Sequence, residues 1–365
     1  MSDHIDDKET LKEIVGLASQ LISYRTTEDK IEELGKCMDF IQSYFEGPDF
    51  FVKRFESKQR PILWVAFNKR KKQKVILNCH MDVVEGQSTQ FNAEVKEGKL
   101  FGRGSSDMKG AVAIFMHLMK HFSRMKKKPG IGLMVVADEE IGGHDGTKYL
   151  IRKGYRSDFG LTGETSKGNI EVKHKGSLQV LLKAYGRASH GSRPWLGRNA
   201  IDILIRQYQK IMDEIPQAKN NNQWLPTVNV TNFISQNPPN VTPSKAEMIL
   251  DIRTTPDFDS KKVLAVLRKN KIRYKKLLEA DILDTKPRNK HVQELRKIAT
   301  RRIGRRVKLI RSSGGSDTRF FYKRGIPAVN FGPSGKGHHT TKEYLELKSV
   351  MPYYLTVHDF ITKSA

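Results

Sequence analysis

Cysteine is scarce in this 365-residue chain, and several other features are missing. Cys37 and Cys79 are the only cysteines, which excludes a disulfide framework and a cysteine-type zinc motif but leaves one disulfide open. The longest apolar runs, such as IGLMVVA at 131–137, have the length of a strand and not of a membrane span. The first residues, MSDHIDDKET, lack the basic start and apolar run of a secretory signal. We therefore expect a protein of the reducing cytoplasm with no membrane segment.

Acidic residues are also in the minority. The chain has 65 Lys and Arg against 40 Asp and Glu, a formal net charge of +25. Such a balance is typical either of a surface for nucleic acid, anionic membrane or acidic substrates, or of a Lys-rich solvated surface. The basic clusters at 69–74, at 124–128 and between Lys261 and Lys308 are scattered, and no recognition-helix, RNP or zinc-finger signature accompanies them. We favour the solvated surface and expect no nucleic-acid partner.

The length suggests two domains. In the first half, periodic apolar residues predict alternating elements: helices at 9–24, 29–46, 110–121 and 146–153, and strands at 50–56, 62–67, 75–79, 131–137 and 158–162. Such alternation predicts an α/β domain with a mostly parallel sheet.

The middle of the chain has another order of elements. We expect strands at 177–186, 226–235, 246–254 and about 277–283, with helices at 197–213 and 259–270. This β-α-β-β-α-β order resembles a split-βαβ, ferredoxin-like α+β sandwich. After Pro287 the alternation of helix and strand returns. The predicted organisation is a catalytic domain of residues 1–174 and 287–365, an inserted domain of residues 175–286, and a cleft between them.

Two motifs in the first half put side chains suited to metal binding at an element boundary. In NCHMDVV, His80 and Asp82 lie two apart at a strand end and so point to the same face. In FGRGSSDMKGAVA, Asp107 lies in a Gly- and Ser-rich turn before a helix. Ordinary structural explanations compete, because a histidine at a strand end is often a satisfied structural group and an aspartate before a helix is commonly an N-cap.

Three further motifs place acids or histidines in loops. VVADEEIGGHDG runs an apolar strand into three acids at 138–140, which repel one another unless cations are present; an ordinary surface loop is the alternative. LTGETS places Glu164 after another apolar strand, and FGPSGKGHHTTKEY places His338 and His339 in a Gly-rich loop. Loops at the carboxyl ends of strands carry ligand sites in α/β sheets. Together the five motifs favour divalent metal ions, zinc first, with cobalt or manganese as alternatives.

The ordered series of motifs resembles the M20 family of metallopeptidases, which includes acetylornithine deacetylase, succinyl-diaminopimelate desuccinylase, aminoacylase and glutamate carboxypeptidase. The resemblance extends over nearly the whole chain, through HMDVV, GRGSSDMKG, ADEEIGG, GETS, ASHGSRPWLGRNAI, NVTPSKAEMILDIR, SSGGSDTRFF and HHTTKEY. It implies a zinc-exopeptidase-like catalytic domain. It also implies that the inserted domain is a lid and dimerisation domain, so that a homodimer is expected.

The resemblance implies a set of metal ligands. Asp107 would bridge two divalent ions, with His80 and Glu164 completing one site and Glu140 and His339 completing the other. His339 is preferred over its neighbour because the family histidine lies four residues before a Glu-Tyr pair, as His339 does.

Further roles follow from the same resemblance. Asp82 would orient the metal-binding histidine at 80, and Glu139 would be the general base. On the inserted domain, His190 would reach across a dimer to stabilise the oxyanion, and Arg253 would bind a substrate carboxylate. Asn240 and the Gly314 and Gly315 loop would line the same pocket. From spacing alone, His190 is equally a surface-loop histidine, and Arg253 an ion-pair partner of Asp251.

Two positions depart from the family pattern. Cys79 stands where glycine is common, and on a strand it should face away from His80 into the packing. His338 stands where a small residue is common, and two roles stay open for it: an additional metal ligand, or a hydrogen-bond donor beside the ligands. The GGSDTRFF loop matches one common family form and leaves specificity open.

The expected activity is hydrolysis of the amide bond of a small N-acyl amino acid or peptide that bears a carboxylate. Metal-activated water would attack, and Glu139 would accept its proton. A glutamate at position 164, instead of an aspartate, resembles the pattern of the deacylase and carboxypeptidase members. The alternative activity is that of a dipeptidase or aminopeptidase of the same family. The rival from another class is a non-catalytic anion- or nucleic-acid-binding relative, and the intact metal set argues against it.

Overall fold

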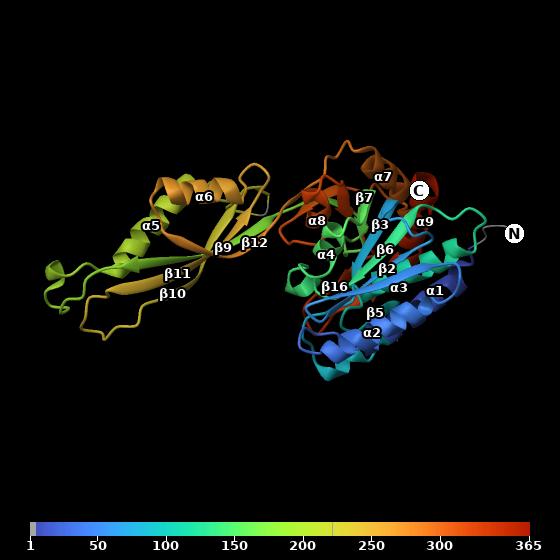
Figure 1. Ribbon diagram of the computed structural model, residues 1–365, viewed down its shortest axis with the longest axis horizontal. Helices are drawn as coiled ribbons and strands as arrows, with labels where there is room; N and C mark the ends of the chain where they lie inside the picture. Colours follow the sequence, from blue (N-terminus) through green and yellow to red (C-terminus); the bar gives the residue numbers. More distant parts are fainter. Residues whose placement is uncertain (1–4, 221) are drawn as a thin grey trace. The chain divides into compact units, whose positions relative to one another are not determined.

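The computed structural model describes residues 5–220 and 222–365, and within them the chain folds into two compact units (Figure 1). Unit 1 holds the chain up to Lys173, then Thr285–Arg311 and Ser316–Ala365. Unit 2 holds His174–Asp284 and Ser312–Gly315. Within the described ranges, no helix is long and apolar enough to cross a membrane.

A mixed β-sheet forms the centre of unit 1, in the order β1-β2-β6-β3-β7-β15-β8-β13, with β14 beside β8; its short end strand β13 belongs to the residues of unit 2. The strands are β1 (Phe51–Ser57), β2 (Arg60–Ala66), β3 (Lys72–His80), β6 (Ile131–Val136), β7 (Arg156–Thr162), β8 (Ile170–His174), β13 (Leu283–Asp284), β14 (Leu309–Ser312) and β15 (Ala328–Asn330). Neighbours among β6, β3, β7 and β15 are parallel. The β1–β2 hairpin, β2–β6 and β15–β8 are antiparallel. The expected mostly parallel sheet is therefore parallel at its centre and mixed as a whole.

Helices cover both faces of this sheet (Figure 1). One face packs against α1 (Asp7–Ser23), α2 (Ile31–Tyr44), α3 (Lys109–Ser123), α7 (Lys290–Ile303) and α9 (Val350–Ser364). The other packs against α4 (Thr147–Arg152) and α8 (Thr318–Lys323). Successive residues of β2 join opposite cores: Leu63 lies in the first and Trp64 in the second. Burial on both faces explains the nearly continuous apolar strands of the sequence.

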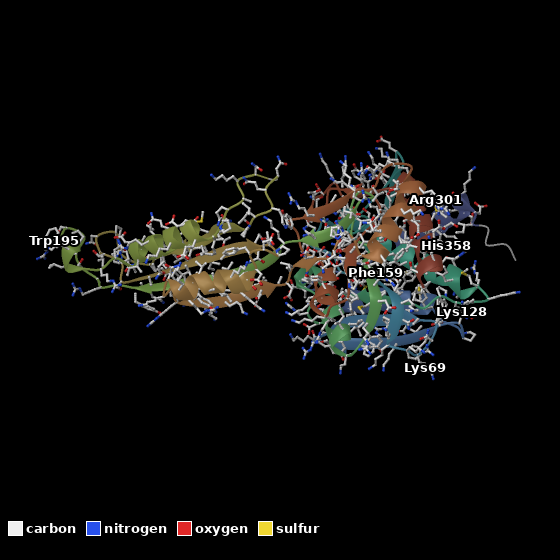
Figure 2. All side chains as sticks on the ribbon, turned by 90° about the horizontal axis from the view of Figure 1, so that it is seen from above. Lys69, Lys128, Phe159, Trp195, Arg301 and His358 are labelled. Atoms are coloured by element: carbon white, nitrogen blue, oxygen red, sulfur yellow. The ribbon has the colours of Figure 1, made fainter. Side chains whose placement is uncertain are left out.

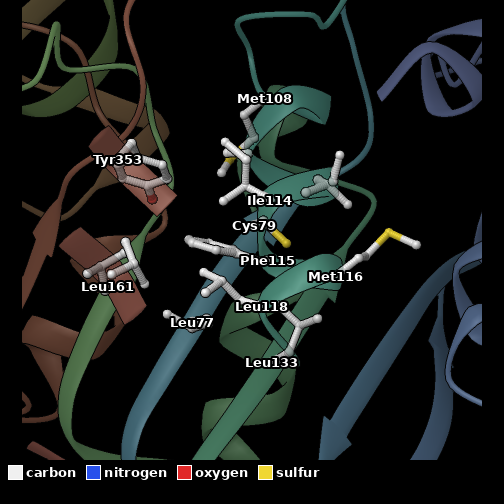
Figure 3. Close-up of a cluster of buried hydrophobic side chains, with 14 of the residues drawn as sticks. Leu77, Cys79, Met108, Ile114, Phe115, Met116, Leu118, Leu133, Leu161 and Tyr353 are labelled. Atoms are coloured by element: carbon white, nitrogen blue, oxygen red, sulfur yellow. The ribbon is translucent and has the colours of Figure 1, made fainter. Parts of the chain in front are cut away.

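Both cysteines are buried free thiols, so the disulfide that the sequence left open is not formed. Burial raises the pKa of Cys37 to about 12 and also raises the pKa of Cys79. The Cys79 side chain lies in the larger core with Leu77 and Phe115 (Figure 3). Its role there is packing.

A small separate sheet in unit 1 joins two distant parts of the chain. Its order is β16-β17-β5-β4, made of β4 (Glu94–Lys96), β5 (Lys99–Phe101), β16 (Gly335–Lys336) and β17 (Tyr344–Glu346). Tyr344 pairs with Phe101 across β17 and β5. The sheet holds the segment before Asp107 beside the segment that carries His339.

Unit 2 is an antiparallel sheet with two helices packed on its apolar face. Its elements are β9 (Gly176–Tyr185), α5 (Ala200–Glu214), β10 (Thr227–Ile234), β11 (Lys245–Thr254), α6 (Ser260–Lys269) and β12 (Tyr274–Ala280). The strand order is β10-β11-β9-β12, that of a split-βαβ sandwich. Short 3₁₀ turns complete the two units: η1 (Ser88–Phe91), η2 (Glu139–Ile141), η3 (Pro194–Leu196) and η4 (Leu347–Ser349).

Candidate metal centre

Three neighbouring parallel strands deliver acidic and histidine side chains to one edge of the central sheet. His80 is the last residue of β3. The adjacent β6 is followed by η2, which contains Glu139 and Glu140. On the other side, β7 ends at Thr162, two residues before Glu164. Because β6, β3 and β7 are parallel, their carboxyl ends meet, which is where α/β sheets carry their ligand sites.

The structure brings the five predicted metal ligands together around Asp107. The Nε2 atom of His80 lies 3.2 Å from Asp107 Oδ1 and 3.4 Å from Glu164 Oε1. The Nε2 atom of His339 lies 3.3 Å from Asp107 Oδ2 and 3.3 Å from Glu140 Oε2. Each oxygen of Asp107 thus faces a different histidine, as a carboxylate between two ions would.

The residues present fit two divalent cations. Two groups have ligand atoms within 4.8 Å of one another: His80, Glu139 and Glu164, and Asp107, Glu140 and His339. The Nε2 atom of His80 is buried and makes no hydrogen bond, an arrangement that is costly unless an ion takes its lone pair. Imidazole nitrogens combined with carboxylate oxygens suit zinc and related metals.

The three glutamates of this cluster have raised pKa values. Burial raises the pKa of Glu139 well above its ordinary value. Burial and the nearby Asp107 raise the pKa of Glu140 to about 7, and they also raise the pKa of Glu164. A cluster of buried acids with this property lacks positive charge, which bound cations supply.

The histidines respond in the opposite sense to the same acids. Burial alone would lower the pKa of His80, but the carboxylates of Asp107, Asp82 and Glu164 raise it well above its ordinary value. Contact with Asp107 raises the pKa of His339 to about 8. Despite its burial, Asp107 has a lowered pKa, because both histidines contact it.

Asp82 holds both the imidazole and the neighbouring ligand loop. The Nδ1 atom of His80 lies 3.0 Å from the backbone oxygen of Asp82 and 3.5 Å from its Oδ1. The other carboxylate oxygen, Oδ2, accepts a hydrogen bond of 2.9 Å from the Glu140 amide. The predicted orienting contact thus comes first from the Asp82 carbonyl, while the carboxylate ties His80 to the Glu140 loop.

Asp107 is not an N-cap. The N-cap of α3 is Met108, and it makes no side-chain capping bond. The peptide between Asp107 and Met108 is cis. The ordinary structural explanation for Asp107 therefore fails.

The two adjacent histidines differ in their contacts. His339 adopts a positive φ of 61° and approaches both Asp107 and Glu140. The Nδ1 atom of His338 lies 3.9 Å from Asp107 Oδ2. The geometry favours His339 as the ligand and leaves His338 beside it.

Buried charged residues behind the cluster were missed in the sequence. Arg103 Nη1 donates to Glu343 Oε2 at 2.6 Å. Arg319 Nη2 donates to the Gly142 carbonyl at 2.8 Å, and its Nη1 lies 3.9 Å from Glu139 Oε1. Arg103, Arg319 and Glu343 all lie within the quoted motifs, but their pairings join segments far apart in the sequence.

The remaining predicted site residues belong to unit 2. Arg253 Nη2 donates to Asp251 Oδ2 at 3.0 Å, which is the ion pair that spacing alone suggested. His190 is exposed, and its Nδ1 accepts a hydrogen bond of 3.2 Å from the Ser192 amide. The Asn240 carbonyl accepts a hydrogen bond of 2.6 Å from Gly191. Gly314 and Gly315 are exposed in the segment 312–315.

Known proteins resemble the chain over nearly its whole length. Succinyl-diaminopimelate desuccinylase of Wigglesworthia glossinidia brevipalpis is 29% identical, covering 86% of this chain and 90% of that protein. The enzyme of the same name from Rickettsia akari is 27% identical, covering 97% and 98%.

Solved structures share the fold. A tripeptidase from Staphylococcus aureus has a TM-score of 0.75 at 19% identity, covering 97% of this chain and 98% of that one. An M20 family metallo-carboxypeptidase from Sulfolobus solfataricus has a TM-score of 0.72 at 19% identity, covering 98% and 99%. The family profile of "Peptidase family M20/M25/M40" matches residues 76–363, most of the chain. The chain therefore belongs to this family, and it is an M20-type metallohydrolase.

Proposed function

We propose that the chain is a dinuclear-metal hydrolase that cleaves the amide bond of a small N-acyl amino acid bearing a carboxylate. One observation carries the proposal: the two oxygens of Asp107 face His80 and His339, and each of these histidines also contacts a glutamate. Two divalent ions, zinc first, would supply Lewis-acid activation of water and of the amide carbonyl.

Glu139 is the proposed proton carrier. It follows β6 directly and lies at the cluster, and Arg319 Nη1 approaches its Oε1 to 3.9 Å. In this role a Glu139 oxygen takes a proton from the attacking water and returns it to the leaving amine. In the same proposal, Asp82 positions the His80 ring through its backbone oxygen and the Glu140 loop through its carboxylate.

Residues of unit 2 are proposed to act on the substrate. Because the Ser192 amide donates to His190 Nδ1, the neutral ring carries its proton on Nε2, where it serves as a donor to an oxyanion. Arg253 uses Nη2 on Asp251, and its guanidinium retains other N–H donors for a carboxylate. We propose that Asn240, Gly314 and Gly315 line the same substrate pocket.

The names of the relatives direct the choice of substrate. Relatives covering most of the chain are named succinyl-diaminopimelate desuccinylases, so we propose N-succinylated amino acids as the first substrate class. Peptide hydrolysis is the second candidate, because Glu164 also matches the carboxypeptidase pattern.

A substrate panel tests this proposal. Zinc-, cobalt- and manganese-loaded protein is assayed with N-succinyl-diaminopimelate, other N-succinyl and N-acetyl amino acids, dipeptides and tripeptides. We expect the highest kcat/KM on an N-succinyl amino acid and complete loss on chelation. A preference for peptides would replace the deacylase assignment. Salt-dependent retention on polyanions with no metal-dependent hydrolysis would favour a binding protein.

We further propose that residues 175–286 form a lid through which two copies associate. Exposed apolar side chains on unit 2 support this. Trp195, labelled in Figure 2, is 73% exposed, and Tyr185 is 62% exposed. The edge strand β10 adds Phe233 and Ile234, which are 41% and 47% exposed. Exposed large apolar side chains and an edge strand are typical of association surfaces.

Hybrid dimers test catalysis in trans. His190→Ala and Glu139→Gln proteins are each inactive under the proposal. Mixing equal amounts, with subunit exchange verified by light scattering, should restore about a quarter of wild-type activity if His190 serves the partner's site, because half of the dimers are hybrid and each has one working site. A dimer that exchanges subunits but recovers no activity argues that His190 acts within its own chain.

A further inference from the structure

Glu343 is a buried carboxylate that collects hydrogen bonds from one short segment. Its Oε2 accepts from Arg103 Nη1 at 2.6 Å and from the Gly104 amide at 3.1 Å. Its Oε1 accepts from the amides of Ser106 and Asp107, at 3.1 Å each. The backbone oxygen of Glu343 accepts from the Gly102 amide at 3.3 Å. Donors throughout residues 102–107 therefore converge on one residue.

The charge of Glu343 is balanced inside the protein. The side chains of Arg103 and Glu343 are 3% and 1% exposed, so neither charge is solvated by bulk water. Breaking such a pair leaves an uncompensated buried charge, which is strongly destabilising locally. The amides of Gly104, Ser106 and Asp107 have the Glu343 carboxylate as their partner. The conformation of the Asp107 loop thus depends on this carboxylate.

The same residue is fixed to the segment that carries His339. Glu343 lies four residues after His339 and immediately before β17. Because β17 pairs with β5 through Tyr344 and Phe101, the two segments are held side by side next to the cluster. The result is the 3.3 Å approach of His339 Nε2 to Asp107 Oδ2.

We propose that Glu343 is a positioning residue: it sets Asp107 against His339 and thereby sets the affinity for the ion held by Asp107, Glu140 and His339. The inference rests on the proposed metal site, but its first part, the order of the Asp107 loop, concerns the metal-free protein. Outer partners of metal ligands typically alter metal affinity by about 10–100-fold.

A matched pair of variants isolates the carboxylate. Glu343→Gln keeps the size of the side chain but turns one acceptor oxygen into an NH₂ group that faces donors. Glu346→Gln, three residues later on β17, is the control, because the Glu346 carboxylate lies near the exposed Lys348, at 3.9 Å.

Amide hydrogen exchange of the metal-free protein is the first readout. We expect the amides of Gly104, Ser106 and Asp107 to exchange at least about tenfold faster in Glu343→Gln, and at the wild-type rate in Glu346→Gln. Unchanged exchange in Glu343→Gln overturns the inference and leaves the proposed function standing.

Zinc titration against a competing chelator is the second readout. We expect Glu343→Gln to weaken the binding of one of the two zinc ions about 10–100-fold. His339→Ala is the reference, because it removes a ligand of that ion. Two wild-type affinities in Glu343→Gln overturn the inference. Wild-type protein that binds no second ion contradicts the proposed metal site itself.

Glu343→Asp replaces Glu343→Gln if the latter does not fold. It keeps the charge beside Arg103 but shortens the reach, so the same amides should exchange faster and the same binding step should weaken. Wild-type exchange rates together with wild-type zinc affinities in Glu343→Asp overturn the inference.

Discussion

Glu139 and Glu140 are adjacent in the chain but have different surroundings. The Glu140 amide is held by Asp82 Oδ2, and its carboxylate lies 3.3 Å from His339 Nε2. The Glu139 carboxylate instead lies 3.9 Å from Arg319 Nη1. These contacts support the proposal that Glu140 holds a metal and Glu139 moves a proton.

Exchange of the Glu139 carboxylate for an amide should separate catalysis from metal binding. We predict that Glu139→Gln keeps the wild-type metal content, while kcat falls by about 10²–10⁴-fold because the proton acceptor is lost. Metal analysis and steady-state kinetics on one preparation check this. Glu140→Gln is the comparison and should lose an ion. A Glu139→Gln protein that loses an ion would show that Glu139 is itself a ligand.

The neighbouring histidines should differ in the same way. His339 contacts two carboxylates of the cluster, whereas His338 lies 3.9 Å from one of them. We predict that His339→Ala binds one ion of the pair at least about 100-fold more weakly, and that His338→Ala changes that affinity by less than about tenfold. Isothermal titration with zinc measures both. The reverse order would transfer the ligand role to His338.

The clustering of the proposed ligands could be predicted from the sequence, but the residues that support them could not. His80, Asp107 and Glu164 are visible because each stands at an element boundary inside a recognisable motif. Glu343 served in the sequence only as a marker for His339. Its pairing with Arg103 joins positions 240 residues apart, and no local pattern reveals such a contact.

The η2 turn places both glutamates, and two glycines of the loop after it, Gly143 and Gly146, are packed against buried acids. Asp138 Oδ2 accepts from the amides of Asp145 and Gly146, which closes the loop after β6. Gly143 has a φ of +64°, and a Cβ there would lie 2.1 Å from Asp317 Oδ1. A residue with a side chain therefore does not fit at position 143 without displacing Asp317 or the backbone of the loop.

We predict that Gly143→Ala destabilises the protein by about 2–4 kcal/mol and lowers metal affinity, because it strains the backbone and displaces the glutamate turn. Gly35→Ala is the control: Gly35 lies inside α2, and a Cβ there meets nothing within 4 Å. That change should stabilise by about 0.5–1 kcal/mol. Urea unfolding measures both free energies, and equal stability of Gly143→Ala and wild type would refute the packing argument.

Long elements were predicted better than short ones. The helix expected at 9–24 is α1, and it begins at Asp7 because the Asp6 side chain accepts hydrogen bonds from Lys8 and Glu9. The small sheet of β4, β5, β16 and β17 was missed. Its strands have two or three residues each, too few for a periodic pattern, and distant pairing forms them.

At the scale of the whole molecule, a chain of net charge +25 brings four carboxylates together at one place. Lys69, Lys128 and Arg301 lie on the surface of unit 1 (Figure 2), as a solvated basic surface requires. The candidate metal centre instead combines four carboxylates with two histidines. The cytoplasmic location stays a prediction.

The acidic centre should make stability depend on pH and on metal. The folded state raises the pKa of Glu140 to about 7 and that of His339 to about 8, so it binds protons more tightly than the unfolded chain. The contribution of each group to the unfolding free energy is fully present at low pH and is lost as pH rises. For Glu140 the loss occurs between about pH 4.5 and pH 7, and for His339 between about pH 6.5 and pH 8.

We therefore predict that metal-free protein loses about 2–3 kcal/mol of unfolding free energy between about pH 5 and pH 8, mostly from Glu140, because solvent screens the half-exposed His339. Zinc should stabilise more at the higher pH, since its ligands must be deprotonated. Chemical unfolding with and without chelator, in buffers of equal ionic strength, checks both trends. Glu140→Gln should flatten the pH dependence, and a metal-free protein that gains stability over this range would contradict the account.

Anomalous X-ray scattering from a crystal of the zinc-loaded protein tests the central claim most directly. The account predicts two zinc peaks about 3.5–4 Å apart. Asp107 should lie between them, with His80 and Glu164 on one ion and Glu140 and His339 on the other. A single peak, or two peaks without Asp107 between them, would contradict the dinuclear centre.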